Sequence, residues 1–207
     1  MRGGMLIAGV GNIFLGDDGF GVEVASRLAA RDLPGWVRVA DYGIRGMHLA
    51  YDLAGAYDSA ILIDATPRGG EPGTIYVIEP DLATQPAADA ALTQNPLFNA
   101  HGMQPDVIFG MLGVLGGRAG TVLVVGCEPA SVAAGMGLSE PVAAAVDEAV
   151  AVVLDLVAAA GPAGGPREPG GGRGSRPGHA SQRPRPAAGD ARGSVRKGWS
   201  HVPWHTR

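Results

Sequence analysis

Five short apolar runs, most of them separated by segments of helix length, occupy the first 160 residues. Such runs predict buried strands, and the amphipathic segments between them predict helices. Only the third and fourth runs lack a helix-length connection, which favours an antiparallel hairpin between these two strands. The pattern predicts an α/β fold: a three-layer sandwich with a mostly parallel five-stranded sheet, one antiparallel strand and helices on both faces. The predicted strands lie at residues 5–10, 36–42, 59–65, 73–80 and 120–129, and the helices at 18–31, 45–55, 105–117 and from 140.

Two of these helices have clear apolar faces. The segment 45–55 places Met47, Leu49, Leu53 and Ala54 on one side. Ser139 is expected to cap the last helix, in which valines recur every three or four residues at 142, 146, 150, 153 and 157.

The charge distribution divides the chain into two regions. The formal net charge is -4, but residues 1–160 hold 7 Lys+Arg and 18 Asp+Glu, a net of -11, and residues 161–207 hold 9 and 2, a net of +7. Because 18 of the last 47 residues are Gly or Pro, we predict a domain at 1–160 and a disordered basic Gly/Pro/Arg-rich tail at 161–207. An acidic domain repels a phosphate backbone, so nucleic acid is not an expected partner.

The single cysteine, Cys127, excludes an internal disulfide. The amino-terminal sequence lacks a signal-peptide pattern, and no apolar run has the length of a membrane span. We therefore expect a cytoplasmic protein without a membrane partner, and a monomer.

Several ionisable residues are predicted at one edge of the sheet. Asp17 and Asp18 follow the first strand, Asp41 and Asp64 end the second and third, and His101 lies in the connection before a helix. The ligand crevice of an open α/β sheet lies at the carboxyl ends of its strands. Carboxylates placed close together repel unless a cation or a shared proton joins them, so the pattern indicates a metal site.

These carboxylates do not all favour a functional role. Asp17, at a helix start, fits a capping role or an interaction with the helix dipole, whereas the spacing of Asp18 is equally compatible with capping and function. Asp64 ends an apolar strand, where an unpaired carboxylate would be costly, and this favours function. Asp41 is expected to accept hydrogen bonds from the following "YGIRG" turn.

The remaining candidates have weaker patterns. His48 is expected on a helix surface, and Cys127, inside "TVLVVGCEP", is expected as a buried apolar side chain rather than a nucleophile. His201 and His205 have the spacing of a metal pair, but the tail provides no helix to present them.

A dinucleotide site is an alternative interpretation of "GVGNIF". The segment has the first two glycines of the G-x-G-x-x-G fingerprint, with Phe14 in place of the third, and Asp41 stands where a ribose-binding carboxylate would be. However, Asp17 and Asp18 would face the pyrophosphate with like charge.

Five ordered segments resemble the maturation endopeptidases of [NiFe] hydrogenases and together span residues 5 to about 157. "GVGNIFLGDDGFG" is similar to the family's amino-terminal signature, and "DYGIRGMHLAYDL" to its D-x-G-x-x-G segment. The other three are "ILIDATPRGGEPGTIYVIEP", "NAHGMQPDVI" and "VVGCEPASVAAGMGLSEPV".

The resemblance implies a specific activity. Such enzymes remove a carboxyl-terminal extension from the large-subunit precursor of a [NiFe] hydrogenase once nickel has been inserted. Nickel is supplied by the precursor, and the nickel-contacting, catalytic residues correspond to Asp18, Asp64 and His101. Either the metal or a carboxylate base could activate the attacking water. Asp18 replaces a glutamate found in some members, and Ile44 replaces a frequent threonine.

A non-catalytic nickel-binding assembly factor for the same precursor is the alternative function. It would use the same three ligands but leave the length of the precursor unchanged. In both cases the Gly43–Gly46 turn and the 81–104 connection flank the site and are the expected peptide-docking surfaces.

Overall fold

The computed structural model describes residues 4–55, 57–80, 108 and 120–161. Its sheet has five strands in the order β2-β1-β3-β5-β4. Four strands are parallel, and β4 runs antiparallel to β5. The strands are β1 (Met5–Val10), β2 (Val37–Gly43), β3 (Ser59–Ala65), β4 (Ile75–Ile78) and β5 (Thr121–Cys127). The predicted fold class is confirmed.

The pairing of β4 differs from the prediction. The short connection after β3 favoured a hairpin of β3 with β4, but β4 pairs with β5, which lies between the two. The seven-residue, largely apolar β5 suits the inner position between β3 and β4, whereas the four-residue β4 lies at the edge of the sheet with alternate residues only partly buried. The chain between β3 and β4 therefore passes the carboxyl end of β5, where Cys127 pairs with both Ala65 and Ile75.

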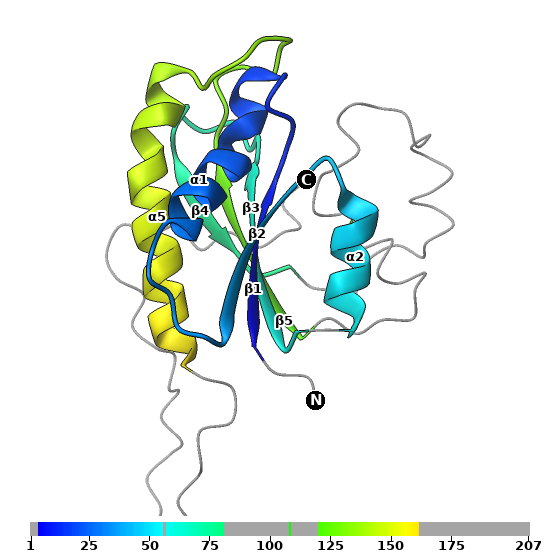
Figure 1. The fold of residues 1–207 in the computed structure, drawn as a ribbon. Coiled ribbons are helices and arrows are strands. Elements are labelled where there is room, and N and C mark those ends of the chain that lie inside the picture. Colours follow the sequence, from blue (N-terminus) through cyan, green and yellow to red (C-terminus); the bar gives the residue numbers. More distant parts are fainter. Residues whose placement is uncertain (1–3, 56, 81–107, 109–119, 162–207) are drawn as a thin grey trace, which may run out of the picture.

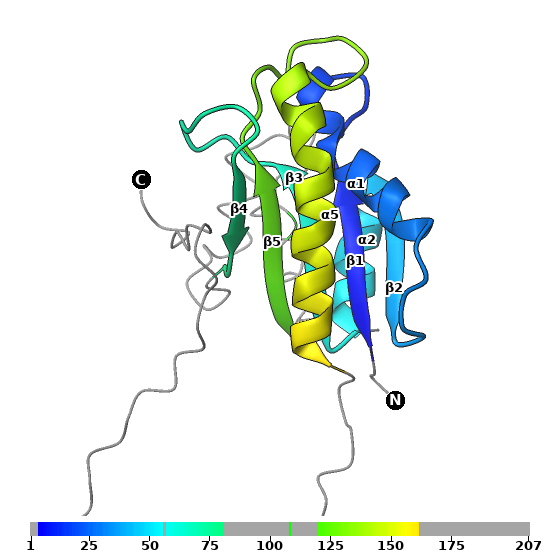
Figure 2. The same cartoon turned by 90° about the vertical axis from the view of Figure 1, so that its left-hand side faces the viewer.

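Helices cover both faces of the sheet, as Figures 1 and 2 show. On one face lie α1 (Phe20–Ala29) and α5 (Glu140–Ala160), and on the other lies α2 (Gly46–Gly55). A short 3-10 helix, η1 (Gly16–Gly19), connects β1 to α1. The sheet and the helices on its two faces form the three layers of the predicted sandwich.

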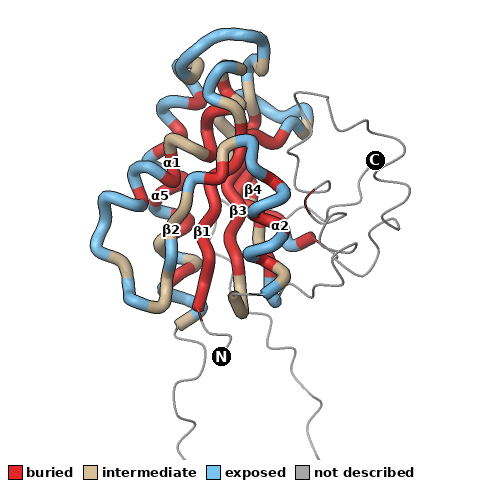
Figure 3. The backbone as a smooth tube through the Cα atoms, turned by 45° about the vertical axis from the view of Figure 1, so that its right-hand side comes forward, coloured by how far each residue is buried: buried red, intermediate tan, exposed pale blue. Residues whose placement is uncertain are grey.

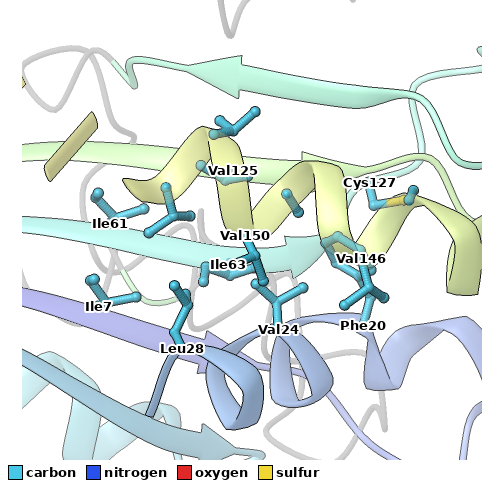
Figure 4. Packing of buried hydrophobic residues seen from close by; sticks show 14 of the residues in the cluster. Ile7, Phe20, Val24, Leu28, Ile61, Ile63, Val125, Cys127, Val146 and Val150 are labelled. Carbon is cyan, nitrogen blue, oxygen red and sulfur yellow. The ribbon is translucent and has the colours of Figure 1, made fainter. Parts of the chain in front are cut away.

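The face under α1 and α5 is filled by aliphatic side chains. Val24 and Leu28 of α1 and Val146 and Val150 of α5 pack with Ile63 of β3, and all five are at most 3% exposed (Figure 4). The predicted valine face of α5 is therefore confirmed. Burying a side chain of this size contributes about 1.5–3 kcal/mol, so this layer is a major source of stability.

The face under α2 forms a second core. Its members include Leu49 and Leu53 of α2, Leu62 of β3 and Ile108, and Figure 3 shows the buried strands beneath the more exposed helix. Ile108 is the one described residue of the predicted 105–117 helix, and it is helical and fully buried. The Tyr42 hydroxyl donates a hydrogen bond to the Asp52 carboxylate, which joins β2 to α2.

Two details of the predicted helices are wrong. Met47 was assigned to the buried side of α2, but it is 46% exposed, because the buried side is formed by Leu49, Ala50 and Leu53. Ser139 does occupy the N-cap position of α5, but its side chain makes no capping hydrogen bond. The predicted tail, 161–207, lies outside the described residues apart from Gly161.

Within the described ranges, we find no helix that combines the length and hydropathy required to cross a membrane.

Candidate functional site

Asp64 is a buried carboxylate at the carboxyl end of β3. Ala60 and Leu62 of this strand belong to the core under α2, whereas Ile61 and Ile63 belong to the core under α1 and α5. Since side chains alternate along a strand, Asp64 continues the face that packs under α2. It is only 4% exposed. An ionised carboxylate in such a place requires charged or hydrogen-bonding partners, as the sequence indicated.

Asp18 lies in η1 and is held by the turn that follows β1. The backbone N–H of Asn12 donates to Asp18 Oδ2 at 2.7 Å. Gly11 adopts φ +123°, and a Cβ there would lie 1.8 Å from the carbonyl oxygen of Asp18. Glycine is therefore needed for the turn to close on this aspartate. The backbone of the "GVGN" motif thus binds the Asp18 carboxylate through the Asn12 N–H.

The two carboxylates lie at the same edge of the sheet. Asp64 lies near the carboxyl end of β3, and Asp18 lies in η1, which follows the adjacent parallel strand β1 and packs against β3. The third predicted ligand, His101, lies outside the described residues. In the described part of the chain, no group of three His, Cys, Asp or Glu side chains is placed to hold a metal ion. A three-ligand nickel site at Asp18, Asp64 and His101 stays a prediction.

Asp17, next to Asp18, has a structural role. It is 1% exposed, and its carboxylate accepts hydrogen bonds from the N–H groups of Ala130, Ser131 and Ser139 at 2.8, 3.0 and 2.6 Å. The Ser139 hydroxyl also donates to it at 2.9 Å, which explains why this side chain does not cap α5. Burial raises the pKa of Asp17, but these hydrogen bonds outweigh burial, so the net pKa lies below its ordinary value.

These contacts fix the segment 128–139, which connects β5 to α5, against the turn before α1. Two backbone hydrogen bonds reinforce them, from Gly16 N–H to the Gly135 carbonyl at 2.9 Å and from Asp17 N–H to the Ser131 carbonyl at 3.0 Å. The prediction that Asp17 is structural rather than a ligand therefore agrees with its contacts. However, Asp17 binds the distant 128–139 segment, whereas the sequence suggested an interaction with the helix that follows it.

Glu128 is a second buried anchor, which the sequence did not reveal. Its carboxylate accepts from the N–H groups of Arg68 and Gly69 at 2.8 and 3.1 Å and from the Tyr76 hydroxyl at 2.8 Å. Burial, together with this hydrogen bond, raises the pKa of Tyr76 to about 12. Glu128 thereby holds the segment after β3, which begins beside Asp64. The position of Glu128 directly after the apolar strand β5 is the sequence feature that could have indicated this role.

The other described candidates are two exposed residues and one buried thiol. Asp41 and His48 are exposed. Arg45 donates a hydrogen bond to the backbone carbonyl of Asp41, and the predicted role of the Asp41 carboxylate in this turn stays a prediction. Cys127 is fully buried, and burial raises the pKa of its thiol to about 12, as expected for an unreactive core cysteine.

The turn geometry disfavours the dinucleotide alternative. In a dinucleotide site the N–H groups after the first strand face the pyrophosphate. Here the Asn12 N–H already donates to Asp18, and the buried Asp17 lies at the start of the following helix. Two carboxylates thus occupy the region that a pyrophosphate would need.

The fold is an open α/β sandwich, and Asp18 and Asp64 lie at the carboxyl ends of its strands, where such sheets bind their ligands. Residues 22–156 match the family model described as hydrogenase maturation protease, and the chain belongs to this family. These proteases are peptidases. The matched range includes Asp64 and His101 and begins just after Asp18.

Known relatives and solved structures agree with this assignment. The chain is 30% identical over 166 residues to the hydrogenase 2 maturation protease of Escherichia coli, covering 79% of this chain and 96% of the relative. A hydrogenase expression/formation protein of Azotobacter chroococcum is 31% identical, with 79% and 76% covered. The structure of a hydrogenase maturating endopeptidase from Escherichia coli has a TM-score of 0.62 at 30% identity, covering 78% of this chain and 95% of that chain.

A hydrogenase 2 maturation peptidase from a Thaumarchaeota archaeon has a TM-score of 0.56 at 31% identity. That comparison covers 74% of this chain and 97% of the archaeal one. The two alignments thus cover nearly the whole length of both solved relatives.

Proposed function

We propose that this protein is an endopeptidase that removes the carboxyl-terminal extension of a [NiFe] hydrogenase large-subunit precursor after nickel insertion. The observation that carries the proposal is the placement of Asp18 and Asp64 at the ends of adjacent strands in a hydrogenase maturation protease fold. Asp18, Asp64 and His101 bind the nickel that the precursor carries. Carboxylate and imidazole groups suit a divalent nickel ion and leave coordination positions open for the precursor.

Nickel binding then selects the precursor that is ready for cleavage. A nickel-free precursor lacks the cation that Asp18 and Asp64 require, so it docks weakly and is not cut. In the loaded complex a water oxygen adds to the scissile carbonyl carbon, the C–N bond breaks, and a proton from that water passes to the leaving amine. The products are the shortened large subunit and the free carboxyl-terminal peptide.

The precursor docks on an exposed apolar stripe, which consists of Ile44, Met47 and Tyr51. Ile44, Met47 and Tyr51 follow β2 at helical spacing and are 61%, 46% and 61% exposed. Exposed large apolar side chains gathered next to a candidate site are typical of protein interfaces. The first residue of the stripe, Ile44, lies in the Gly43–Gly46 turn, directly after the carboxyl end of β2.

The proposal is tested by incubating the purified protein with nickel-loaded and nickel-free precursor and measuring the precursor mass. Loss of a carboxyl-terminal peptide from the loaded precursor alone is the expected result. Asp64→Asn should abolish this processing while the protein stays folded. Binding of both proteins without any change of mass would support the assembly-factor function instead.

A further inference from the structure

Thr66 has a buried side-chain oxygen with no hydrogen-bond partner in the part of the chain that the structure describes. Among the described residues, its Oγ1 is the one buried side-chain nitrogen or oxygen in this condition. The residue as a whole is 9% exposed. Buried hydroxyl groups in folded proteins normally have a partner, and an unsatisfied one lowers stability. Such a group is expected where function requires it.

Thr66 lies beside Asp64 on the same face of the sheet. Its N–H donates to the Cys127 carbonyl at 2.8 Å, so the pairing of β3 with β5 continues one residue beyond β3. Residues two apart on a strand share a face and are about 6.6 Å apart along it. This spacing allows a threonine hydroxyl and an aspartate carboxylate to meet by rotation about side-chain bonds.

Gly126 provides the space for the Thr66 side chain. It is the partner of Asp64 in the β3–β5 register. A Cβ on Gly126 would lie 2.6 Å from Thr66 Oγ1 and 2.7 Å from Thr66 Cβ, closer than real contacts allow. The side chain of Thr66 therefore rests over a glycine that pairs directly with Asp64.

We propose that Thr66 is a positioning residue, whose hydroxyl donates a hydrogen bond to the Asp64 carboxylate when that carboxylate binds the nickel of the precursor. This inference rests on the proposed function. A carboxylate that ligates a metal is commonly held by a hydrogen bond from a neighbouring group, and this bond fixes its orientation. In the unbound protein the hydroxyl has no partner among the described residues, so it is available for this role.

The role makes stability and binding respond in opposite directions to Thr66→Val. Valine has nearly the same shape but lacks the hydroxyl, so it removes an unsatisfied buried group from the free protein. The melting temperature should therefore stay the same or rise. The complex with nickel-loaded precursor should instead weaken, because Asp64 loses its orienting donor. A merely structural threonine would not produce this combination.

The test compares the full-length wild type with Thr66→Val, Thr66→Ser and Asp64→Asn. Thr121→Val, at an exposed position at the start of β5, is the matched control. The melting temperature and the dissociation constants for nickel-loaded and nickel-free precursor are measured for each. We expect Thr66→Val to weaken binding of the loaded precursor by about 10- to 100-fold, with nickel-free binding unchanged. Serine at position 66 and valine at position 121 should both behave like the wild type.

Two results would overturn the inference while leaving the proposed function intact. One is wild-type affinity of Thr66→Val for the loaded precursor while Asp64→Asn is weakened. The other is a loss of melting temperature in Thr66→Val that accompanies its loss of affinity. If the wild type itself binds loaded and nickel-free precursor equally, the proposed nickel recognition fails, and the inference fails with it.

Discussion

The Asp17 carboxylate accepts two hydrogen bonds from one residue, Ser139, whose N–H lies 2.6 Å from Oδ1 and whose hydroxyl lies 2.9 Å from Oδ2. Asp18, the next residue, instead accepts from Asn12 at 2.7 Å. Two adjacent aspartates thus have different environments. One is almost fully buried and secures a loop, and the other is partly exposed at the candidate site.

Asparagine substitutions at the two positions should separate stability from activity. Asp17→Asn replaces a charged acceptor of four hydrogen bonds by an amide, and we expect a loss of about 2 kcal/mol of unfolding free energy. Asp18→Asn should change stability much less but abolish precursor cleavage. Urea unfolding and the cleavage assay check both variants, and a greater loss of stability in Asp18→Asn would contradict this assignment.

The contribution of Asp17 should disappear in acid. Its folded pKa lies below the ordinary 3.8, so its stabilisation is fully present above about pH 5 and is lost as the pH falls through the folded value. The difference in unfolding free energy between wild type and Asp17→Asn should therefore shrink between about pH 5 and pH 2. Urea titrations across this range measure it. A difference that is constant over the range would show that the charge of Asp17 is not the source.

Cys127 should be unreactive in the folded protein. Burial raises the pKa of its thiol to about 12, so at pH 8 its thiolate fraction is roughly a thousandfold below that of an exposed cysteine. Thiol labelling should be slow in the folded protein and fast in denaturant, which is the internal control. Cys127→Ala should keep its cleavage activity, and rapid labelling of the native protein with inactivation would refute the structural role.

The apolar stripe of Ile44, Met47 and Tyr51 should affect docking of the precursor rather than the chemical step. Ile44→Ser removes an exposed isoleucine, and we expect KM to rise about tenfold with little change in kcat, equivalent to about 1.4 kcal/mol of lost contact. Met136→Ser, at a residue 76% exposed in the segment between β5 and α5, is the control. A rise in KM for the Met136 variant alone would place the docking surface at that segment.

Much of the fold could be predicted because the sequence patterns are local. The buried strands were visible as apolar runs, and the valines of α5 marked its buried face. The pairing of β4 was not visible, since a short connection usually forms a hairpin and only the competing strand β5 alters that outcome. Met47 was misassigned because several rotations of a short apolar helix fit the same sequence.

In the candidate site, too, features with a local sequence pattern could be predicted, and contacts between distant segments could not. Asp64 stood out because a carboxylate at the end of an apolar strand requires an explanation. The partners of Asp17 lie 113 to 122 residues later in the chain, and the partners of Glu128 lie 52 to 60 residues earlier. Periodicity and spacing carry no information about contacts between such distant segments. The anchors were therefore found only in the folded structure.

The separation between Asp17 and Ser139 also has a consequence for biosynthesis. Chains are made from the amino terminus, and amino-terminal segments can begin to fold before the rest has been translated. Asp17 is synthesised long before Ser139, which lies 122 positions later in the chain. Until then its carboxylate must remain hydrated, and the turn carrying Asp18 lacks its support. The anchor between the turn and the loop after β5 can therefore form only once translation has passed Ser139.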